Sequence, residues 1–107
     1  MDVFTQRAIA LIQQIPAGRV TTYGIIATAA GNHCGARQVS RILFSSSEKY
    51  DLPWHRVVNR QRRISPRTSG SHVKQKHLLE TEGVCFAPDG TIDFSRFLWL
   101  PQAENIK

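Results

Sequence analysis

The chain has 107 residues, enough for one domain with one hydrophobic core, and its 41% hydrophobic and 21% charged residues are typical of a globular protein rather than a disordered one. No apolar run approaches the roughly 20 residues of a membrane span, and the N-terminus lacks the apolar region of a secretory signal. Lys and Arg total 14 against 8 Asp and Glu, and the resulting net charge of +6 favours a polyanionic partner, most often nucleic acid. We therefore expect a single cytoplasmic domain over residues 1–107 with no membrane partner.

The first half of the chain predicts three helices. Apolar residues recur at helical spacing between residues 4 and 15, and a Pro-Ala-Gly sequence ends this first helix. Thr21-Thr22 offers an N-cap for a short second helix over residues 23–30. A third helix is expected from Gly35 to about Ser45, with Arg37 in its first turn.

The second and third helices, joined by a tight turn that contains glycine, have the outline of a helix-turn-helix. In such a motif the later helix enters a groove of DNA. The small residues Gly35, Ala36 and Ser40 would let this helix approach a partner closely. An ordinary helical hairpin fits the same pattern, so the spacing alone leaves both interpretations open.

The middle of the chain predicts a basic wing beside the helices. Residues 45–52 are polar and are expected to form a loop. Residues 54–59 and 64–65 are expected to form two short strands, or a loop of that shape, joined by the tip Arg60-Gln61-Arg62-Arg63. Residues 54–77 hold seven Lys or Arg and no acid, so the positive charge is concentrated around this wing.

The C-terminal third predicts one more helix and a hairpin. Ser71 can cap a helix over residues 72–82, which Gly83 would end. Its inward-facing residues are expected to include Val73, Leu78 and Leu79. Two short extended segments within residues 84–94 flank Asp89-Gly90, a pattern typical of a β-hairpin. Together the elements predict a mainly α fold with small β elements.

Two cysteines, Cys34 and Cys85, are too few for a disulfide scaffold, and we expect both to be thiols. Cys34 follows His33, but the spacing to the other cysteine and the other histidines fits no standard zinc pattern. We therefore expect no metal site and no cofactor.

The tetrapeptide Pro53-Trp54-His55-Arg56 is the most distinctive motif of the chain. With Thr22-Tyr23-Gly24, Ala36-Arg37-Gln38-Val39 and Glu82-Gly83 at their spacings, it resembles the DNA-binding domain of the O6-alkylguanine-DNA alkyltransferases over residues 3–100. That family carries Pro-Cys-His-Arg-Val at the matching place. A tryptophan instead of the cysteine is the mark of the alkyltransferase-like proteins, which bind alkylated DNA without accepting the alkyl group. The resemblance implies a winged helix-turn-helix-like DNA-binding domain.

The residue types at this motif agree with a non-enzymatic role. Alkyl transfer from O6 of guanine needs a thiolate with an adjacent base, and indole is a poor nucleophile. The resemblance matches His55 and Glu82 to the pair that activates the family's cysteine, and a purely structural hydrogen bond between them is the plainer alternative. It also implies a lesion pocket that includes Pro53, Trp54, His55 and Arg67, in which the indole offers an apolar wall.

The resemblance further assigns residues to nucleotide flipping. Tyr23 matches a tyrosine that crowds a backbone phosphate, and Arg37 matches an arginine that fills the vacated base stack. Arg67 matches a basic residue that senses the electrostatics of the lesion, although it could equally be one of several solvated arginines. Arg62 and Arg63, at the tip of the wing, are expected to contact DNA phosphates.

We therefore expect a monomeric, non-enzymatic protein that binds O6-alkylguanine in double-stranded DNA and flips the nucleotide into a Trp-lined pocket. By resemblance, it would direct the site to nucleotide excision repair proteins and associate with the nucleoid when bound to DNA. Two other classes stay open. One is an active alkyltransferase that uses Cys34 or Cys85, although neither lies in the Pro-Trp-His-Arg motif. The other is a winged-helix transcription regulator that reads a sequence in the major groove.

Overall fold

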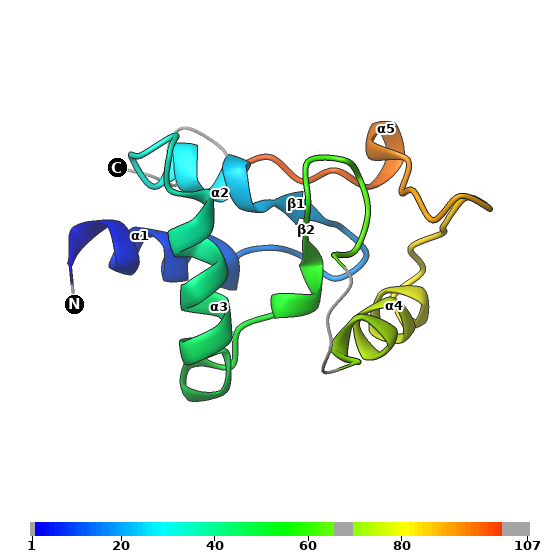
Figure 1. The fold of residues 1–107 in the computed structure, drawn as a ribbon, viewed down its shortest axis with the longest axis horizontal. Helices are drawn as coiled ribbons and strands as arrows, with labels where there is room; N and C mark the ends of the chain where they lie inside the picture. Colours follow the sequence, from blue (N-terminus) through cyan, green and yellow to red (C-terminus); the bar gives the residue numbers. More distant parts are fainter. Residues whose placement is uncertain (1, 66–69, 102–107) are drawn as a thin grey trace.

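The computed structural model describes residues 2–65 and 70–101 and begins with helix α1 (Val3–Gln13), as Figure 1 shows. The Asp2 carboxylate accepts a hydrogen bond of 2.8 Å from the backbone N–H of Thr5 and so caps this helix. The chain then forms strand β1 (Thr21–Thr22) and passes directly into helix α2 (Tyr23–Ala29). The predicted cap is confirmed, because the Thr22 hydroxyl accepts a hydrogen bond from the Ile25 N–H.

Helix α3 (Ala36–Tyr50) is longer than predicted, because residues 45–50 continue the helix instead of forming a loop. The hydroxyls of Ser45 and Ser47 donate to the carbonyls of Arg41 and Leu43, so these serines bond within the helix. At the far end, Tyr50 packs against the hydrophobic core. The polar composition of this segment was therefore a misleading signal.

The prediction of two paired strands in the wing is wrong. Residues Trp54–Arg56 form a short 3₁₀ helix, η1, and strand β2 (Val57–Val58) pairs in parallel with β1 rather than with residues 64–65. Residues 59–63 form a turn that is closed by a hydrogen bond of 3.0 Å from the Asn59 N–H to the Arg63 carbonyl. The wing is thus a loop, which was the alternative shape expected from the sequence.

Helix α4 (Ser71–Thr81) begins after Gly70 in a left-handed conformation, so Ser71 is its first residue and not its cap. The helix ends as expected at a glycine: Gly83 has a φ of 96°, and the backbone N–H groups of Gly83 and Val84 bond to the carbonyls of Glu80 and Leu79. Val73 was expected to face inward but is exposed; Gln75 is the buried polar residue of this helix.

The expected hairpin around Asp89-Gly90 is present as one antiparallel bridge between Phe86 and Ile92. A short helix, α5 (Phe94–Phe97), follows, and Phe97 is buried. Mostly helical structure with a small two-stranded sheet thus agrees with the predicted fold class.

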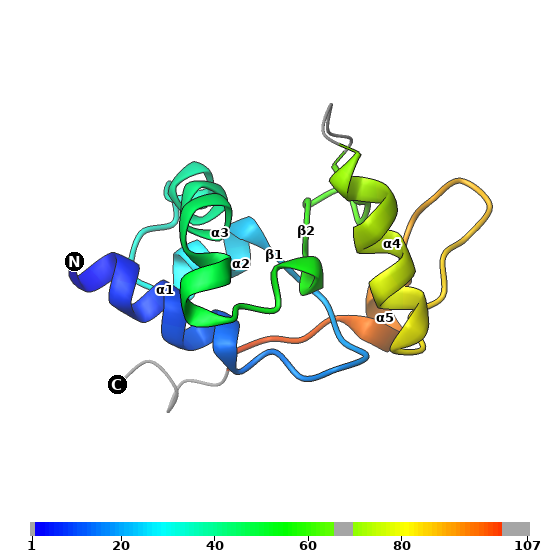
Figure 2. The ribbon, with the colours of Figure 1, turned by 90° about the horizontal axis from the view of Figure 1, so that it is seen from below.

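The two strands lie between two hydrophobic clusters, and Figure 2 shows α1, α2 and α3 on one side of them and α4 and α5 on the other. The neighbouring residues Val57 and Val58 belong to different clusters, because successive side chains of a strand point to opposite faces. The strand that follows η1 is therefore held from both sides. Whether residues 1–107 make up one domain stays a prediction.

Candidate functional site

The Pro-Trp-His-Arg motif lies at the junction between α3 and β2, where η1 gives it a tight turn. The Trp54 N–H donates to the Leu52 carbonyl at 2.8 Å, and the Arg56 N–H donates to the Pro53 carbonyl at 3.0 Å. The Trp54 side chain packs partly against the first hydrophobic cluster. Its ring meets the His55 ring edge-on, with ring centres 6.1 Å apart.

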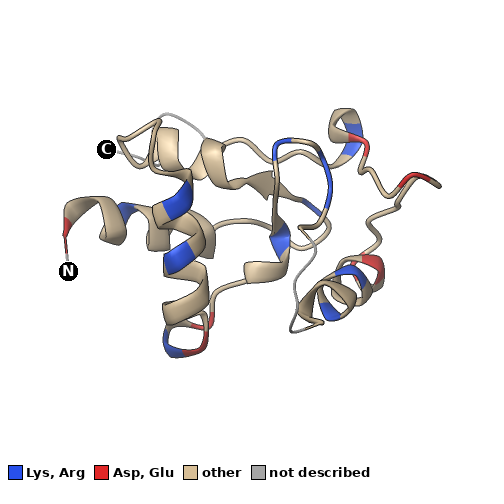
Figure 3. Ribbon diagram, viewed as in Figure 1, with Lys and Arg blue, Asp and Glu red and all other residues tan. Residues whose placement is uncertain are grey.

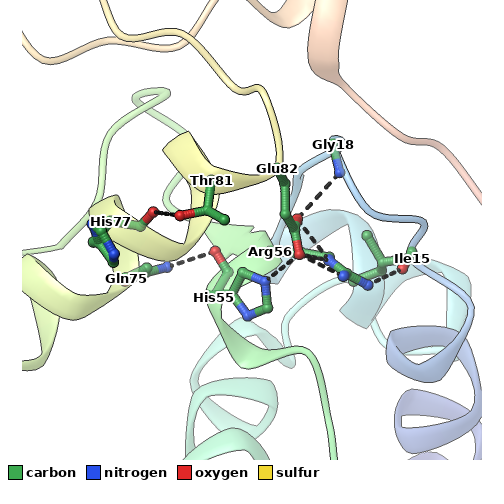
Figure 4. A network of polar contacts seen from close by, with 8 residues as sticks. All are labelled: Ile15, Gly18, His55, Arg56, Gln75, His77, Thr81 and Glu82. Atoms are coloured by element: carbon green, nitrogen blue, oxygen red, sulfur yellow. Dashed lines mark hydrogen bonds and ion pairs between the residues drawn. The ribbon is translucent and has the colours of Figure 1, made fainter.

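The Glu82 carboxylate, at the end of α4, joins three separate segments of the chain (Figure 4). His55 Nε2 lies 2.9 Å from its Oε2, and the Arg56 guanidinium donates to both carboxylate oxygens, with its Nη2 at 2.6 Å from Oε2. The Gly18 N–H donates to Oε1 at 3.1 Å. Arg56 also donates from Nη1 to the Ile15 carbonyl at 2.8 Å, which ties the site to the segment after α1.

These contacts keep Glu82 ionised. Partial burial of the carboxyl opposes ionisation, but the hydrogen bonds from Arg56, His55 and Gly18 outweigh it and lower the pKa from 4.5 to about 2. An ionised carboxylate is only an acceptor, so the His55 nitrogen that faces it, Nε2, carries a hydrogen. The hydrogen bond to Glu82 uses Nε2, and the other ring nitrogen, Nδ1, takes no part in it.

Gln75 fixes the backbone of the motif from the side of α4. Its side chain is 2% exposed, and its Nε2 donates to the carbonyls of His55 at 3.1 Å and Val57 at 3.0 Å. One amide group thus donates to two backbone carbonyls, one on each side of Arg56. The second half of the motif is thus held twice, by Glu82 through the side chains of His55 and Arg56 and by Gln75 through the backbone.

A pocket of about 520 Å³ opens beside the motif. Its walls are the segment Asp51–Arg56, Gln13 at the end of α1, and Lys74 and Leu78 on α4. Three of the four residues predicted to line a lesion pocket, Pro53, Trp54 and His55, are therefore together. The fourth, Arg67, lies outside the described residues. The volume is in the usual range for pockets that hold small molecules.

Four residues predicted to contact DNA lie outside the walls of this pocket: Tyr23, Arg37, Arg62 and Arg63. Tyr23 is the first residue of α2 and packs partly against the first hydrophobic cluster. Arg37 is exposed in the first turn of α3, as expected. Arg62, with a φ of 65°, and Arg63 are exposed in the wing loop, where Arg63 Nη2 lies 3.8 Å from Asp89 Oδ2. Figure 3 shows the positive residues on α3, the wing loop and α4.

Sequence reasoning missed the roles of Arg56, Gln75 and Lys74. The only sequence signal for Arg56 was its position next to His55; the structure shows that Glu82 contacts both side chains. Gln75 could not be found by hydrophobic periodicity, since it is a polar residue on the inward face of α4.

Residues 2–65 and 70–101 contain neither a membrane-spanning helix nor a metal-binding group of side chains. Within these residues, no helix is long and apolar enough to cross a membrane. In the same part of the chain, no three His, Cys, Asp or Glu side chains are grouped so that they could hold a metal ion. Cys34 and Cys85 are both exposed free cysteines.

Comparison with known proteins shows likeness along nearly the whole chain. The family model of the 6-O-methylguanine DNA methyltransferase DNA-binding domain matches residues 3–84. The DNA base-flipping protein of Escherichia coli K12 is 44% identical over 98 residues, which are 92% of this chain and 75% of the relative. Alkyltransferase-like protein 1 of Schizosaccharomyces pombe is 40% identical over 106 residues, covering 94% of this chain and 98% of the relative.

The likeness extends to solved structures. S. pombe Atl1 in complex with damaged DNA containing O6-carboxymethylguanine matches with a TM-score of 0.81 at 35% identity, covering 94% of this chain and 98% of that chain. The O6-methylguanine methyltransferase of Mycobacterium tuberculosis matches with a TM-score of 0.61 at 26% identity, covering 77% of this chain and 49% of that chain. These matches confirm the predicted fold class.

Proposed function

The chain belongs to the family of the 6-O-methylguanine DNA methyltransferase DNA-binding domain, to its alkyltransferase-like members, and from this we propose that it recognises O6-alkylguanine in duplex DNA without removing the alkyl group. The nucleotide is flipped out of the duplex into the pocket beside Trp54. The bound complex then marks the lesion for nucleotide excision repair proteins. DNA that carries the lesion is thus the partner, and the protein acts as a single domain and a monomer.

One observation carries the proposal: Trp54 and His55 both line the pocket beside η1, His55 is bonded to Glu82, and no thiol is among the described residues that line the pocket. Alkyl transfer needs a sulfur atom that attacks the carbon bonded to O6. Indole does not perform this attack at neutral pH, but its flat face can pack against a base or an alkyl group. The site therefore keeps the hydrogen-bonded pair and lacks the reacting atom.

The two cysteines give little support to an enzyme. Cys34 lies in the turn between α2 and α3, and Cys85 follows α4; both are exposed and both are outside the pocket walls. Neither thiol adjoins His55, which is the base that the motif provides. Transfer to either cysteine would place the alkylated base away from the pocket.

Flipping is required because a base inside a duplex presents only its edges in the grooves. Extrusion costs a few kcal/mol, about the same as the contacts that a flipped base gains in a pocket. Arg37 suits the vacated space, since its planar guanidinium stacks and its N–H groups can bond to the orphaned base. Tyr23, at the start of α2, is assigned to the phosphate beside the flipped nucleotide.

The names of the relatives support this proposal. A relative from E. coli is called a DNA base-flipping protein, and the S. pombe relative has been solved on DNA with an O6-carboxymethylguanine. Both are alike to this chain over more than nine-tenths of its length.

The test compares binding with transfer on the same DNA. The protein is incubated with duplex that contains O6-methylguanine, and both the dissociation constant and the intact protein mass are measured. We expect tighter binding than to the unmodified duplex and no added methyl group. A stoichiometric mass increase of one methyl would overturn the non-enzymatic proposal, and equal affinity for both duplexes would overturn lesion recognition.

A Trp54→Ala variant tests the pocket itself. If the indole contacts the flipped base, its loss should weaken the alkylated complex by roughly 1–3 kcal/mol and the plain duplex far less. Trp99→Ala is the matched control, because Trp99 also packs partly against the first hydrophobic cluster but does not line the pocket. Equal losses on both duplexes with Trp54→Ala would show that the ring does not hold the lesion.

A further inference from the structure

Helix α3 carries an aromatic residue where an amphipathic helix would carry a polar one. Phe44 is 88% exposed, more than any other large hydrophobic residue among those described. The buried residues of α3 are Val39, Ile42 and Leu43. At 100° per residue, Phe44 lies on the opposite side of the helix from the middle of this buried set. It therefore contributes nothing to the core of the protein.

The neighbours of Phe44 on the exposed side identify the kind of surface it belongs to. Arg37, Arg41 and Phe44 follow at i, i+4 and i+7, so they form one row along the exposed face, and both arginines are exposed. The acid nearest to this row, Glu48, comes one turn later. The row thus combines two cations with an aromatic ring, a combination found on surfaces that bind nucleic acids, and the net charge of +6 favours such a polyanionic partner.

The dimensions of the row agree with the spacing of nucleotides in DNA. Seven residues of α-helix advance about 10 Å, and three steps of duplex DNA cover about the same distance. If Arg37 fills the base stack at the flipped nucleotide and α3 runs along the strand, Phe44 lies about three nucleotides away. Deoxyribose presents carbon atoms there between successive phosphates.

We propose that Phe44 is a DNA-contacting residue of α3 that packs against deoxyribose groups about three nucleotides from the flipped base. This inference rests on the proposed function, because it takes α3 as the helix that faces DNA. Arg41, between the two, contacts a phosphate. The Phe44 ring contributes affinity by burying apolar surface, so its contribution does not depend on the release of counterions.

The salt dependence of binding separates an apolar contact from an ionic one. We expect Phe44→Ala to weaken binding to lesion-containing duplex about tenfold while the slope of log K against log salt stays as in the wild type. Phe44→Leu keeps an apolar side chain, so its affinity for the lesion-containing duplex should lie between those of the wild type and Phe44→Ala. Arg41→Ala, in contrast, should reduce the slope by about 0.9, the value for one phosphate contact. Val73→Ala is the matched control, since Val73 is an exposed apolar residue of α4 (66%) and outside the row.

The outcomes of this experiment are distinguishable from a failure of the proposed function. If the wild type shows no preference for the lesion, the proposed function fails whatever the variants do. If the wild type binds the lesion and Phe44→Ala binds as tightly as Val73→Ala, the contact proposed here is wrong. A reduced salt slope in Phe44→Ala would overturn it as well, since the ring carries no charge. Circular dichroism should show equal helix content in all variants, because Phe44 makes no core contact.

Discussion

Glu82 determines what His55 can do in this site. An ionised carboxylate whose pKa is about 2 accepts the hydrogen on Nε2 and fixes the ring orientation. Arg56 donates three hydrogen bonds to the same two oxygens, which stabilise the ionised form of Glu82 and partly offset the negative charge that His55 faces. If a cysteine stood at the position of Trp54, this arrangement would prepare His55 to act as the base that takes the thiol proton. With Trp54 in that place, the same contacts hold the pocket wall in one shape.

Arg37 is the residue whose removal should separate flipping from folding. Because its side chain is exposed in the first turn of α3, Arg37→Ala should leave the melting temperature within about 2 °C of the wild type, as is usual for exposed sites. Its loss leaves the vacated stack empty, so we expect the affinity for O6-methylguanine duplex to fall at least tenfold. A fluorescent base analogue beside the lesion reports extrusion. If Arg37→Ala gives the same fluorescence rise as the wild type at saturation, a group other than Arg37 fills the stack.

At the scale of elements, the sequence predicted what depends on local pattern. The structure contains each of the predicted short-range features. They are the apolar faces of α1, α2 and α3, the N-cap at Thr22 and the helix end at Gly83. The parallel pairing of β1 with β2 joins residues 36 positions apart, and no local pattern specifies it. In the extension of α3 to Tyr50, the serine hydroxyls bond to carbonyls of their own helix and Tyr50 packs against the first hydrophobic cluster, a long-range contact that composition does not reveal.

The site was predictable to the extent that its residues are fixed by the motif. Pro53, Trp54 and His55 are consecutive, so any fold brings them together, and the resemblance supplied Glu82 as the partner of His55. Gln75 and Lys74 come from the same helix but face different surroundings, Gln75 the backbone of η1 and β2 and Lys74 the pocket. Which side of α4 faces the motif is decided by tertiary packing, and hydrophobic periodicity had indicated Val73 instead.

The wing loop is the element whose charge should set nonspecific affinity. Arg62 and Arg63 are exposed there, and the pairing of Arg63 with Asp89 at 3.8 Å is weak enough for a phosphate to displace the carboxylate. We expect Arg62→Ala/Arg63→Ala to weaken plain and alkylated duplexes alike and to reduce the salt slope by about 0.9 to 1.8, one or two phosphate contacts. The slope is measured by fluorescence anisotropy over a range of salt.

Arg19→Ala/Arg96→Ala is the control for net charge, because it removes the same two charges outside the wing. Arg19 Nη1 donates to the Arg96 carbonyl and Arg96 lies over the Phe97 ring, so both belong to the region of α5. If the two double variants reduce the slope equally, the effect comes from the overall charge of the protein and not from the wing loop.

At the scale of the molecule, the Glu82 cluster connects the two sides of the fold. Ile15 and Gly18 belong to the segment after α1, His55 and Arg56 to the turn before β2, and Glu82 to the end of α4. These segments border both hydrophobic clusters, so the loss of the Glu82 charge weakens its contacts with the segment after α1 and with the turn before β2. A cluster of this kind makes stability depend on pH in a defined window.

The pKa of Glu82 falls from 4.5 to about 2 on folding, so the ionised form stabilises the native state above pH 4.5, and this stabilisation is lost as pH falls towards 2. A shift of this size corresponds to at most about 3 kcal/mol at neutral pH. We therefore expect Glu82→Gln to be less stable than the wild type at pH 7 and the difference to shrink between pH 4.5 and pH 2. Urea unfolding at pH 7, 4 and 3 measures the free energy of unfolding of the wild type and of Glu82→Gln.

Subtracting the two pH curves isolates Glu82 from the other carboxyl groups. Asp2, Asp89 and Asp93 also have lowered pKa values, because each accepts hydrogen bonds from a nearby hydroxyl and backbone N–H. These groups are the same in both proteins, so their contribution cancels in the difference. A difference that stays constant from pH 7 to pH 3 would mean that Glu82 titrates alike in the folded and unfolded chain, and that its contacts with Arg56 and His55 do not persist in solution.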